Sequence, residues 1–172
     1  MTEILIIGAG VVGASVAFHL AQRGVRDILV VDRAGDLGAG STAKATGGFR
    51  AQFDNETEIR LSLLARDKLR NFRDEVGADP GYAPHGYLFL AMNDAELDAL
   101  RRTNTLQRAC GLTEARIVSE DEIRAINPAI EQFIGGAFCP TDGFLAPMNI
   151  LRGYADAARR LGVRFAFGVD EV

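Results

Sequence analysis

The stretch ILIIGAGVVG (residues 4–13) decides the fold of this chain of 172 residues. Its first four residues form a short continuous apolar run, which is typical of a strand covered on both faces. A helical pattern of apolar residues follows over residues 11–22, and Gly24 stands where such a helix would end. A second apolar run occupies residues 27–31. Two parallel strands need a crossover connection, so the sequence predicts a right-handed βαβ unit at this point.

The turn inside this unit has the pattern G-x-G-x-x-G, formed by Gly8, Gly10 and Gly13. In dinucleotide-binding folds the first glycine permits a tight turn and the second lets a pyrophosphate approach the backbone. The third lets the helix pack closely on the strand. Val11 and Val12 begin the helix, whose free N–H groups would point at the phosphates. The pattern therefore predicts dinucleotide binding, although glycine-rich turns of this kind also serve packing alone.

An acidic residue closes the second strand, as the dinucleotide fingerprint requires. Asp32 stands at that position, where a carboxylate accepts hydrogen bonds from the two ribose hydroxyls of an adenosine. The neighbouring Arg33 could instead contact a 2′-phosphate, which would indicate NADP, or lie on the surface. The fingerprint by itself does not distinguish NAD(P) from FAD.

The next segment, LGAGSTAKATGGFR (residues 37–50), bears on the choice of cofactor. It is rich in glycine and hydroxyl side chains and carries little else, as if its backbone lay against something flat and large. An NAD(P) fold usually continues here into another crossover helix. The pattern resembles the amine-oxidising flavoproteins of the D-amino-acid oxidase superfamily, which includes glycine oxidase, sarcosine oxidase and sarcosine dehydrogenase. The residues that match are Asp32, Gly38, Gly40, Ser41, Thr42, Gly47, Gly48, Phe49 and Arg50.

The resemblance extends over essentially the whole chain. HGYLFLA (residues 85–91) is similar to a strand of these proteins' substrate domain, and GGAFCPTDGFLAP (residues 135–147) is similar to their G-G-x-x-x-P-x-D-G-x-x-x-P segment. It implies an α/β chain with a Rossmann-like FAD-binding domain of the glutathione-reductase type, built on a parallel sheet, and part of an antiparallel α+β substrate domain. We expect the FAD domain over residues 1–77, substrate-domain segments over residues 78–147, and a return to the FAD domain over residues 148–172.

Members of this superfamily are about twice as long, so we expect the chain to be an N-terminal fragment. An isolated half of such an enzyme would expose apolar surface that the other half covers. We expect the intact protein to be an FAD-dependent amino-acid or amine oxidase or dehydrogenase, and the fragment alone to be inactive.

The resemblance also implies a set of cofactor contacts to non-covalent FAD. A histidine that tethers the flavin in the sarcosine and dimethylglycine dehydrogenase branch is replaced here by Lys44, so we expect no covalent link at that point. The residues implied to contact FAD are Gly8, Gly10, Val11, Val12, Gly13, Asp32, Arg33, Gly40, Ser41, Thr42, Thr46, Gly47 and Gly48.

Arg50 is the one residue that the resemblance places on the substrate side of the flavin. A planar guanidinium with fixed donors suits a carboxylate, whereas the alternative role is a surface or interdomain salt bridge. The implied reaction is oxidation of the C–N bond of a small amino acid or N-methyl amino acid to an imine. No Ser–His–Asp arrangement, paired-carboxylate motif or metal-ligand spacing competes with it, and no metal is expected. An NAD(P)-dependent dehydrogenase domain and a non-catalytic FAD-binding subunit remain as alternatives.

Composition and charge argue against several classes of protein. A net charge of −4 argues against nucleic-acid binding, which usually needs a clustered positive field. Cys110 and Cys139 are too few for a disulfide scaffold or metal cluster, and we expect both to be buried thiols in a cytoplasmic protein. The apolar N-terminal stretch is interrupted by glycines and His19, so no secretory signal or membrane span is expected. A homo- or hetero-oligomer is compatible with all of this.

The middle of the chain has the residue patterns that are typical of helices. Apolar spacing predicts a helix over residues 55–76 with Gly77 as its stop. Three pairs have the spacing of helix N-terminal caps: Asn55 with Glu58, Asn93 with Glu96, and Ser119 with Glu122.

Overall fold

A computed structural model describes residues 3–170 and separates the chain into two compact units. Unit 1 takes the residues up to Gly47, the segment Asn71–Tyr82 and the residues from Leu145 onward. Unit 2 takes Gly48–Arg70 and Ala83–Phe144. The units thus divide the chain at residues 47, 70, 82 and 144, whereas the sequence places its functional domain boundaries at residues 77 and 147. Gly48–Arg70, assigned by sequence to the FAD domain, lies in unit 2.

Unit 1 is built on a parallel three-stranded sheet in the order β1-β2-β8. The register pairs Leu5 with Leu29 and Val30 with Phe165. The predicted βαβ unit is therefore present, and α/β with a parallel sheet is confirmed. Its elements are β1 (Ile4–Ile7), α1 (Val11–Gln22), β2 (Ile28–Asp32), α2 (Ser41–Lys44), α4 (Phe72–Val76), α7 (Pro147–Arg160) and β8 (Arg164–Phe167).

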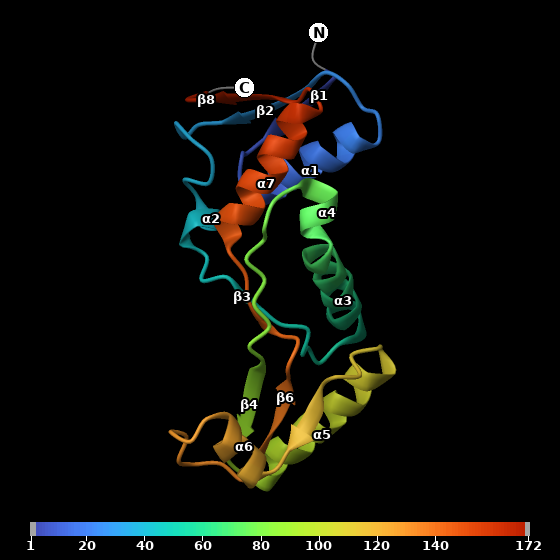
Figure 1. Cartoon of the computed structure of the whole chain (residues 1–172), viewed down its shortest axis with the longest axis vertical. Coiled ribbons are helices and arrows are strands. Elements are labelled where there is room, and N and C mark those ends of the chain that lie inside the picture. The colour runs from blue at the N-terminus through green and yellow to red at the C-terminus, as the bar shows by residue number, and fades with distance from the viewer. Residues whose placement is uncertain (1–2, 171–172) are drawn as a thin grey trace. The chain divides into compact units, whose positions relative to one another are not determined.

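The helices α1 and α7 lie side by side against one face of this sheet (Figure 1). Small and apolar residues allow the close approach: Ala14, Leu151 and Ala155 are fully buried in one cluster. A second contact joins α4 to α7, where the rings of Phe72 and Tyr154 meet edge to face at 4.9 Å between centroids.

The other face of β1 is open among the described residues. Leu5 is 44% exposed and Ile7 75% exposed, while the alternate residues Ile4 and Ile6 point toward α1 and are partly covered. The prediction that this strand is covered on both faces is wrong for residues 3–170, because successive side chains alternate between faces and helices cover only one of them. Leu5 and Ile7 thus leave apolar surface exposed on unit 1.

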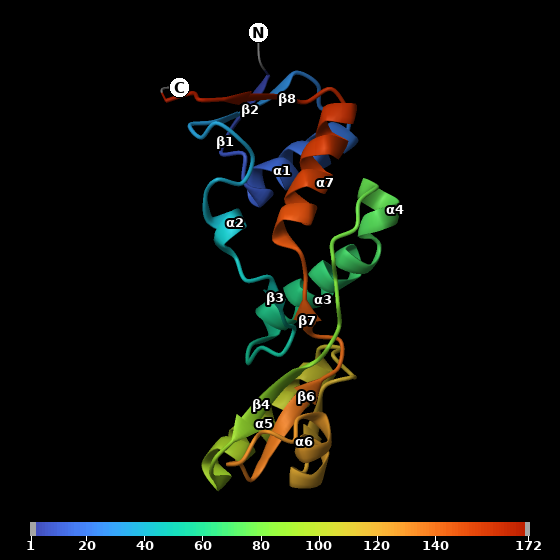
Figure 2. The same cartoon turned by 60° about the vertical axis from the view of Figure 1, so that its left-hand side comes forward.

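Unit 2 contains an antiparallel sheet in the order β4-β6-β5 and a short two-stranded ladder, β3-β7. Figure 2 shows β4 and β6 running side by side. Helix α5 packs on this sheet, and α3 contacts α5. The predicted antiparallel part is therefore confirmed. Its elements are β3 (Gly48–Phe49), α3 (Glu56–Arg70), β4 (Tyr87–Ala91), α5 (Asp94–Ala109), β5 (Arg116–Val118), α6 (Glu120–Ile126), β6 (Gly135–Cys139) and β7 (Gly143–Phe144).

The predicted helix over residues 55–76 is two helices, α3 and α4. Asn71 separates them as the N-cap of α4, and Phe72 is buried in unit 1 while α3 belongs to unit 2. Periodicity cannot show this break, because apolar spacing continues through a change of partner. Gly77 ends α4 with a left-handed φ of 83°, as predicted.

The three predicted caps are confirmed. The side chains of Asn55, Asn93 and Ser119 accept hydrogen bonds from the backbone N–H groups of Glu58, Glu96 and Glu122, at 2.9, 3.0 and 3.4 Å. Both cysteines are buried free thiols, also as predicted. None of the helices within residues 3–170 is long and apolar enough to span a membrane.

Candidate functional site

The turn between β1 and α1 in unit 1 has the tight geometry that its glycines predict. Gly8 follows β1 with a φ of 109°, and its N–H donates to the carbonyl of Val31 at 2.7 Å. A Cβ at Gly13 would collide with the carbonyl oxygen of Gly8, so only glycine lets α1 start this close to the strand. Two of the three predicted glycine functions, the turn and the close packing, are therefore visible in the structure.

Asp32 organises this turn from the end of β2. Its carboxylate accepts the N–H of Ala9 at 2.8 Å and the N–H of Ala34 at 2.9 Å. The hydrogen bond from Ala34, followed by that from Ala9, lowers the pKa of Asp32 below its ordinary value. The carboxylate is half-buried and ionised, and it joins the glycine turn to the segment after β2. The sequence pattern indicated a ribose acceptor here and gave no sign of this second, structural role.

Two clefts meet at Ile7 and Gly8 along this turn. One, of about 670 Å³, is lined among others by Asp32, Arg33 and Gly40. The other, of about 610 Å³, follows the start of α1 and α2, and its lining includes Gly10, Val11, Val12, Gly13, Ser41 and Thr42. The structure thus brings together ten of the residues predicted from sequence, and we name this region the glycine cradle.

The glycine cradle has the properties of a site for an anionic dinucleotide. Gly10 caps α1 without a side-chain acceptor, which leaves the positive end of a 12-residue helix facing the cleft. A Cβ at Gly8 or Gly40 would meet no protein atom within 4 Å, so a side chain there would project into cleft space. Thr42 Oγ1 accepts the N–H of Val11 at 3.2 Å and holds α2 against the helix start. The residues present therefore fit a bound pyrophosphate.

Three predicted cofactor residues lie outside these clefts. Thr46 and Gly47 follow α2 in unit 1, and the carbonyl of Gly47 accepts the N–H of Leu145 at 2.8 Å. With a φ of 78°, Gly47 also approaches the Leu145 carbonyl too closely for a Cβ. Gly48 lies in unit 2, where it pairs with Phe144 in the β3-β7 ladder. The structure gives Gly47 and Gly48 backbone roles and shows no contact for Thr46 with the cradle.

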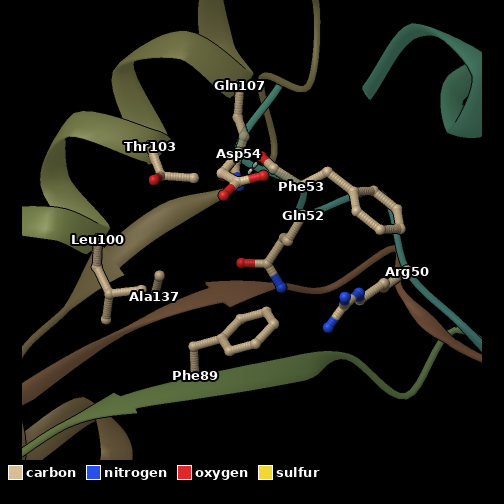
Figure 3. A pocket seen from close by; sticks show the side chains of 9 residues that line it. All are labelled: Arg50, Gln52, Phe53, Asp54, Phe89, Leu100, Thr103, Gln107 and Ala137. Atoms are coloured by element: carbon tan, nitrogen blue, oxygen red, sulfur yellow. Dashed lines mark hydrogen bonds between the residues drawn. The ribbon is translucent and has the colours of Figure 1, made fainter. Parts of the chain in front are cut away.

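Arg50 lies in unit 2, just after β3, at a pocket of about 260 Å³ (Figure 3). Its guanidinium carbon is 4.7 Å from the ring centroid of Phe53 and 5.5 Å from that of Phe89. Within residues 3–170 the Arg50 side chain has no carboxylate or hydrogen-bond partner, so the structural salt bridge considered from sequence is absent there. The pocket is lined by Arg50, Gln52, Phe53, Asp54, Phe89, Leu100, Thr103, Gln107 and Ala137.

A second aspartate, Asp142, holds the backbone that carries Arg50. It is fully buried, and its two carboxylate oxygens accept the N–H of Ala51 at 2.9 Å and Nε2 of Gln52 at 3.2 Å. Burial raises the pKa of Asp142, while the hydrogen bonds from Ala51 and Gln52 oppose that rise. Asp142 belongs to the TDG segment noted in the sequence, but residue pattern alone assigned it no role. Its partners are about 90 residues away, at separations that only folding reveals.

Lys44 is the last residue of α2, and its side chain is exposed. Among the described residues, no group of three or more His, Cys, Asp or Glu side chains could hold a metal ion. Within the described part of the chain, two constructions therefore stand out: the glycine cradle of unit 1 and the Arg50 pocket of unit 2.

Comparison with known proteins agrees with this arrangement. The family model described as FAD dependent oxidoreductase matches residues 3–172. The chain belongs to this family. FAD is the family's cofactor, so FAD is favoured over NAD(P). The resemblance to FAD-dependent oxidoreductases that the sequence shows is confirmed.

Over the region that aligns, three known proteins are 26% to 30% identical to the chain. It is 26% identical to the pyruvate dehydrogenase phosphatase regulatory subunit of Mus musculus, over 94% of this chain and 18% of that protein. It is 30% identical to dimethylglycine dehydrogenase of Rattus norvegicus, over 94% of this chain and 19% of that one. The structure of L-proline dehydrogenase from P. horikoshii superposes with a TM-score of 0.88 and 28% identity, over 97% of this chain and 44% of that chain. The chain thus spans less than half the length of each of these relatives.

Proposed function

We propose that the chain is part of an FAD-dependent oxidoreductase that oxidises the C–N bond of a small amino acid or N-methyl amino acid. When bound, FAD supplies the acceptor for the hydride that leaves the carbon beside the nitrogen, and water then hydrolyses the resulting imine. Family membership supports the cofactor, and a relative named dimethylglycine dehydrogenase supports an N-methyl substrate.

In this proposal the glycine cradle holds the dinucleotide. The N-terminus of α1 faces the pyrophosphate, while Ser41 and Thr42 border it from α2. Asp32 is ionised and retains acceptor capacity for ribose hydroxyls beside its bonds to Ala9 and Ala34. Lys44 occupies the position of the histidine that forms a covalent link, so the flavin is held non-covalently.

The observation that carries the substrate assignment is the state of Arg50. Its guanidinium lies over the rings of Phe53 and Phe89 and lines a pocket, yet no carboxylate of residues 3–170 pairs with it. A stacked guanidinium keeps its in-plane donors available, and two parallel N–H bonds match a carboxylate. A substrate carboxylate on Arg50 orients the amino acid and limits its freedom, which are the protein's main contributions to such a reaction.

The experiment begins with a titration of the purified whole protein of which this chain is part with FAD, followed by flavin fluorescence and visible absorption. We expect binding, and release of the flavin on acid precipitation. Anaerobic addition of N-methylglycine should then bleach the oxidised flavin band. Arg50→Lys should raise the concentration for half-bleaching about tenfold or more, because the bidentate geometry is lost.

Arg116→Lys is the matched control for this measurement. Arg116 also lies over a phenylalanine ring of unit 2, at 5.8 Å from Phe138, but it pairs with Glu122 outside the Arg50 pocket. It should leave the bleaching curve unchanged. Equal effects of the two substitutions would contradict the carboxylate role of Arg50.

A non-catalytic FAD-binding subunit is the second candidate, because one relative is named a regulatory subunit. The same experiment separates the two candidates. A whole protein that binds FAD but is bleached by no amino acid or N-methyl amino acid supports the regulatory candidate and contradicts the oxidoreductase.

A further inference from the structure

Two buried amide groups of the Arg50 pocket have a fixed orientation. Gln52 is 4% exposed and Gln107 3% exposed. Nε2 of Gln52 donates to the carbonyl of Tyr87 at 2.9 Å and to Asp142, and Nε2 of Gln107 donates to the carbonyl of Phe53 at 3.0 Å. All three partners are acceptors, so the amide nitrogen of each glutamine is the atom that must face them. The orientation of each Oε1 follows from this network.

Neither of these amide oxygens has a hydrogen-bond partner within residues 3–170. Buried polar atoms in folded proteins are nearly always paired, and an unpaired one is costly. Both side chains line the pocket, so a molecule bound there can supply the missing N–H donors. Two oriented oxygens of this kind specify a ligand group with at least two donors.

The charges around the pocket are arranged with opposite signs on different sides. Figure 3 shows the Arg50 guanidinium on one side of Gln52. The amide oxygen of Gln52 points away from Arg50, and the Asp54 carboxylate lies on the side of Gln52 that is away from Arg50. Asp54 is exposed at this pocket and adds negative charge near the amide oxygens. Phe89, Leu100 and Ala137 contribute apolar wall to the same pocket. A zwitterion with a short apolar body matches this arrangement.

We propose that the Arg50 pocket recognises both ends of an amino acid, and this inference rests on the proposed function for its carboxylate contact. The amino group is held by Oε1 of Gln52 and Oε1 of Gln107, with Asp54 balancing its positive charge. A protonated secondary amine has two N–H bonds, one for each amide oxygen. The pocket is therefore selective for primary and secondary amino acids and rejects fully substituted nitrogen, which keeps the charge but has no donor.

Matched ligands test this inference on the intact chain without added FAD. N-methylglycine is titrated against N,N,N-trimethylglycine, and the side-chain ¹⁵N–¹H resonances of Arg50, Gln52 and Gln107 are followed by NMR. We expect N-methylglycine to shift all three, and the trimethyl compound to bind about tenfold or more weakly because a charge-assisted hydrogen bond is lost at each oxygen. Equal affinity for the two ligands would overturn the inference.

The resonances also separate this inference from the proposed function. If N-methylglycine shifts Arg50 but neither glutamine, the amino-group site is wrong while the carboxylate anchor stands. If no amino acid shifts Arg50, the carboxylate anchor itself fails, and the inference fails with it.

Two substitutions provide an independent test. Gln107→Met keeps the length of the side chain but removes the oxygen, and it should weaken N-methylglycine about tenfold while leaving the trimethyl compound unchanged. Because Gln107 also bonds to Phe53, the backbone amide spectrum of unit 2 must confirm that the variant is folded. Asp54→Asn, at an exposed position, should weaken N-methylglycine a few-fold without affecting folding.

Thr105→Ala is the matched control, since Thr105 is exposed on the same helix α5 and lines no part of the pocket. It should leave both affinities unchanged. If folded Gln107→Met and Asp54→Asn both bind N-methylglycine like the unaltered chain, the amino-group site is refuted.

Discussion

Asp32 in unit 1 and Asp142 in unit 2 perform similar structural tasks in different surroundings. Each accepts two hydrogen bonds from a loop that carries candidate site residues: Asp32 from Ala9 and Ala34, Asp142 from Ala51 and Gln52. Asp32 is half-buried, and its backbone hydrogen bonds dominate and lower its pKa. Asp142 is fully buried, and desolvation dominates and raises its pKa.

At Asp142 burial outweighs the hydrogen bonds and sets the direction of the pKa shift, whereas at Asp32 the hydrogen bonds outweigh burial. A half-buried carboxylate with two N–H donors is stabilised as an anion, and it can still face a cleft and accept further donors. A buried carboxylate is costly to ionise even when it accepts hydrogen bonds, and its removal leaves the N–H of Ala51 without a partner. The first arrangement suits a cofactor cradle, whereas the second fixes a loop rigidly.

The largest effect on stability is expected for Asp142→Ala. It leaves the N–H of Ala51 unpaired inside the protein and removes one of the two acceptors of Gln52 Nε2, at a cost of about 3 kcal/mol in the free energy of unfolding. Urea denaturation followed by circular dichroism measures this, and amide hydrogen exchange should show faster opening of unit 2. Asp54→Ala, at an exposed position, is the control and should change stability by less than about 0.5 kcal/mol. A loss of similar size in both variants would contradict the role given to Asp142.

A smaller effect is expected for Gly13→Ala in the cradle. The added Cβ collides with the carbonyl of Gly8, so β1 and α1 must separate at a cost of about 2 kcal/mol. Here hydrogen exchange should report opening of unit 1, not of unit 2, and FAD affinity should fall. Gly35→Ala is the control, because a Cβ at Gly35 meets no atom within 4 Å and its φ is not positive.

Thr42→Val tests one hydrogen bond of the cradle. The substitution keeps the shape but removes the acceptor for the N–H of Val11, and we expect a loss of about 1 kcal/mol. Thermal unfolding of Thr42→Val beside Thr42→Ser, which retains the hydroxyl, measures the contribution of the bond. Equal stability of the two variants would show that the Thr42 hydroxyl does not hold α2 to α1.

The smallest effects are the slopes of stability against pH, which should have opposite signs for the two aspartates. The folded state lowers the pKa of Asp32 below its ordinary value of 3.8, so near that pH the unfolded state binds more protons than the folded state. The stability that ionised Asp32 contributes to the folded state is therefore lost as pH falls through the folded pKa. The raised pKa of Asp142 means that the folded state binds more protons above 3.8, so stability is lost as pH rises through the folded pKa. One group contributes at most about 1.4 kcal/mol per pH unit.

Asp32→Asn and Asp142→Asn check these signs by urea denaturation over a pH series. Asp32→Asn should flatten the rise of stability with pH below the ordinary carboxyl pKa of 3.8. Asp142→Asn should flatten the decline of stability with pH above that value. The same direction of change in both variants would contradict the comparison between the two aspartates.

Much of the cradle could be predicted because it is local. Gly8, Gly10 and Gly13 are close in sequence, and Asp32 follows one strand later, so strand, turn and helix preferences place them together. The capping pairs at Asn55, Asn93 and Ser119 could be predicted for the same reason. The change of helix at Asn71 could not, because the same apolar spacing serves two different partners on either side of it.

The sequence by itself determined the βαβ unit, the glycine cradle, the class of cofactor and the interest of Arg50, because each depends on residues near one another or on a pattern that many chains share. Only the tertiary structure decided that Arg50 lies over two rings, that Asp142 holds its backbone, and that two amide oxygens in its pocket lack donors. The hydrogen bonds that fix the backbone and the amide groups of this pocket join residues 35 to 91 positions apart, and such separations carry no periodic signal. Burial and hydrogen-bond geometry arise only when these segments come together.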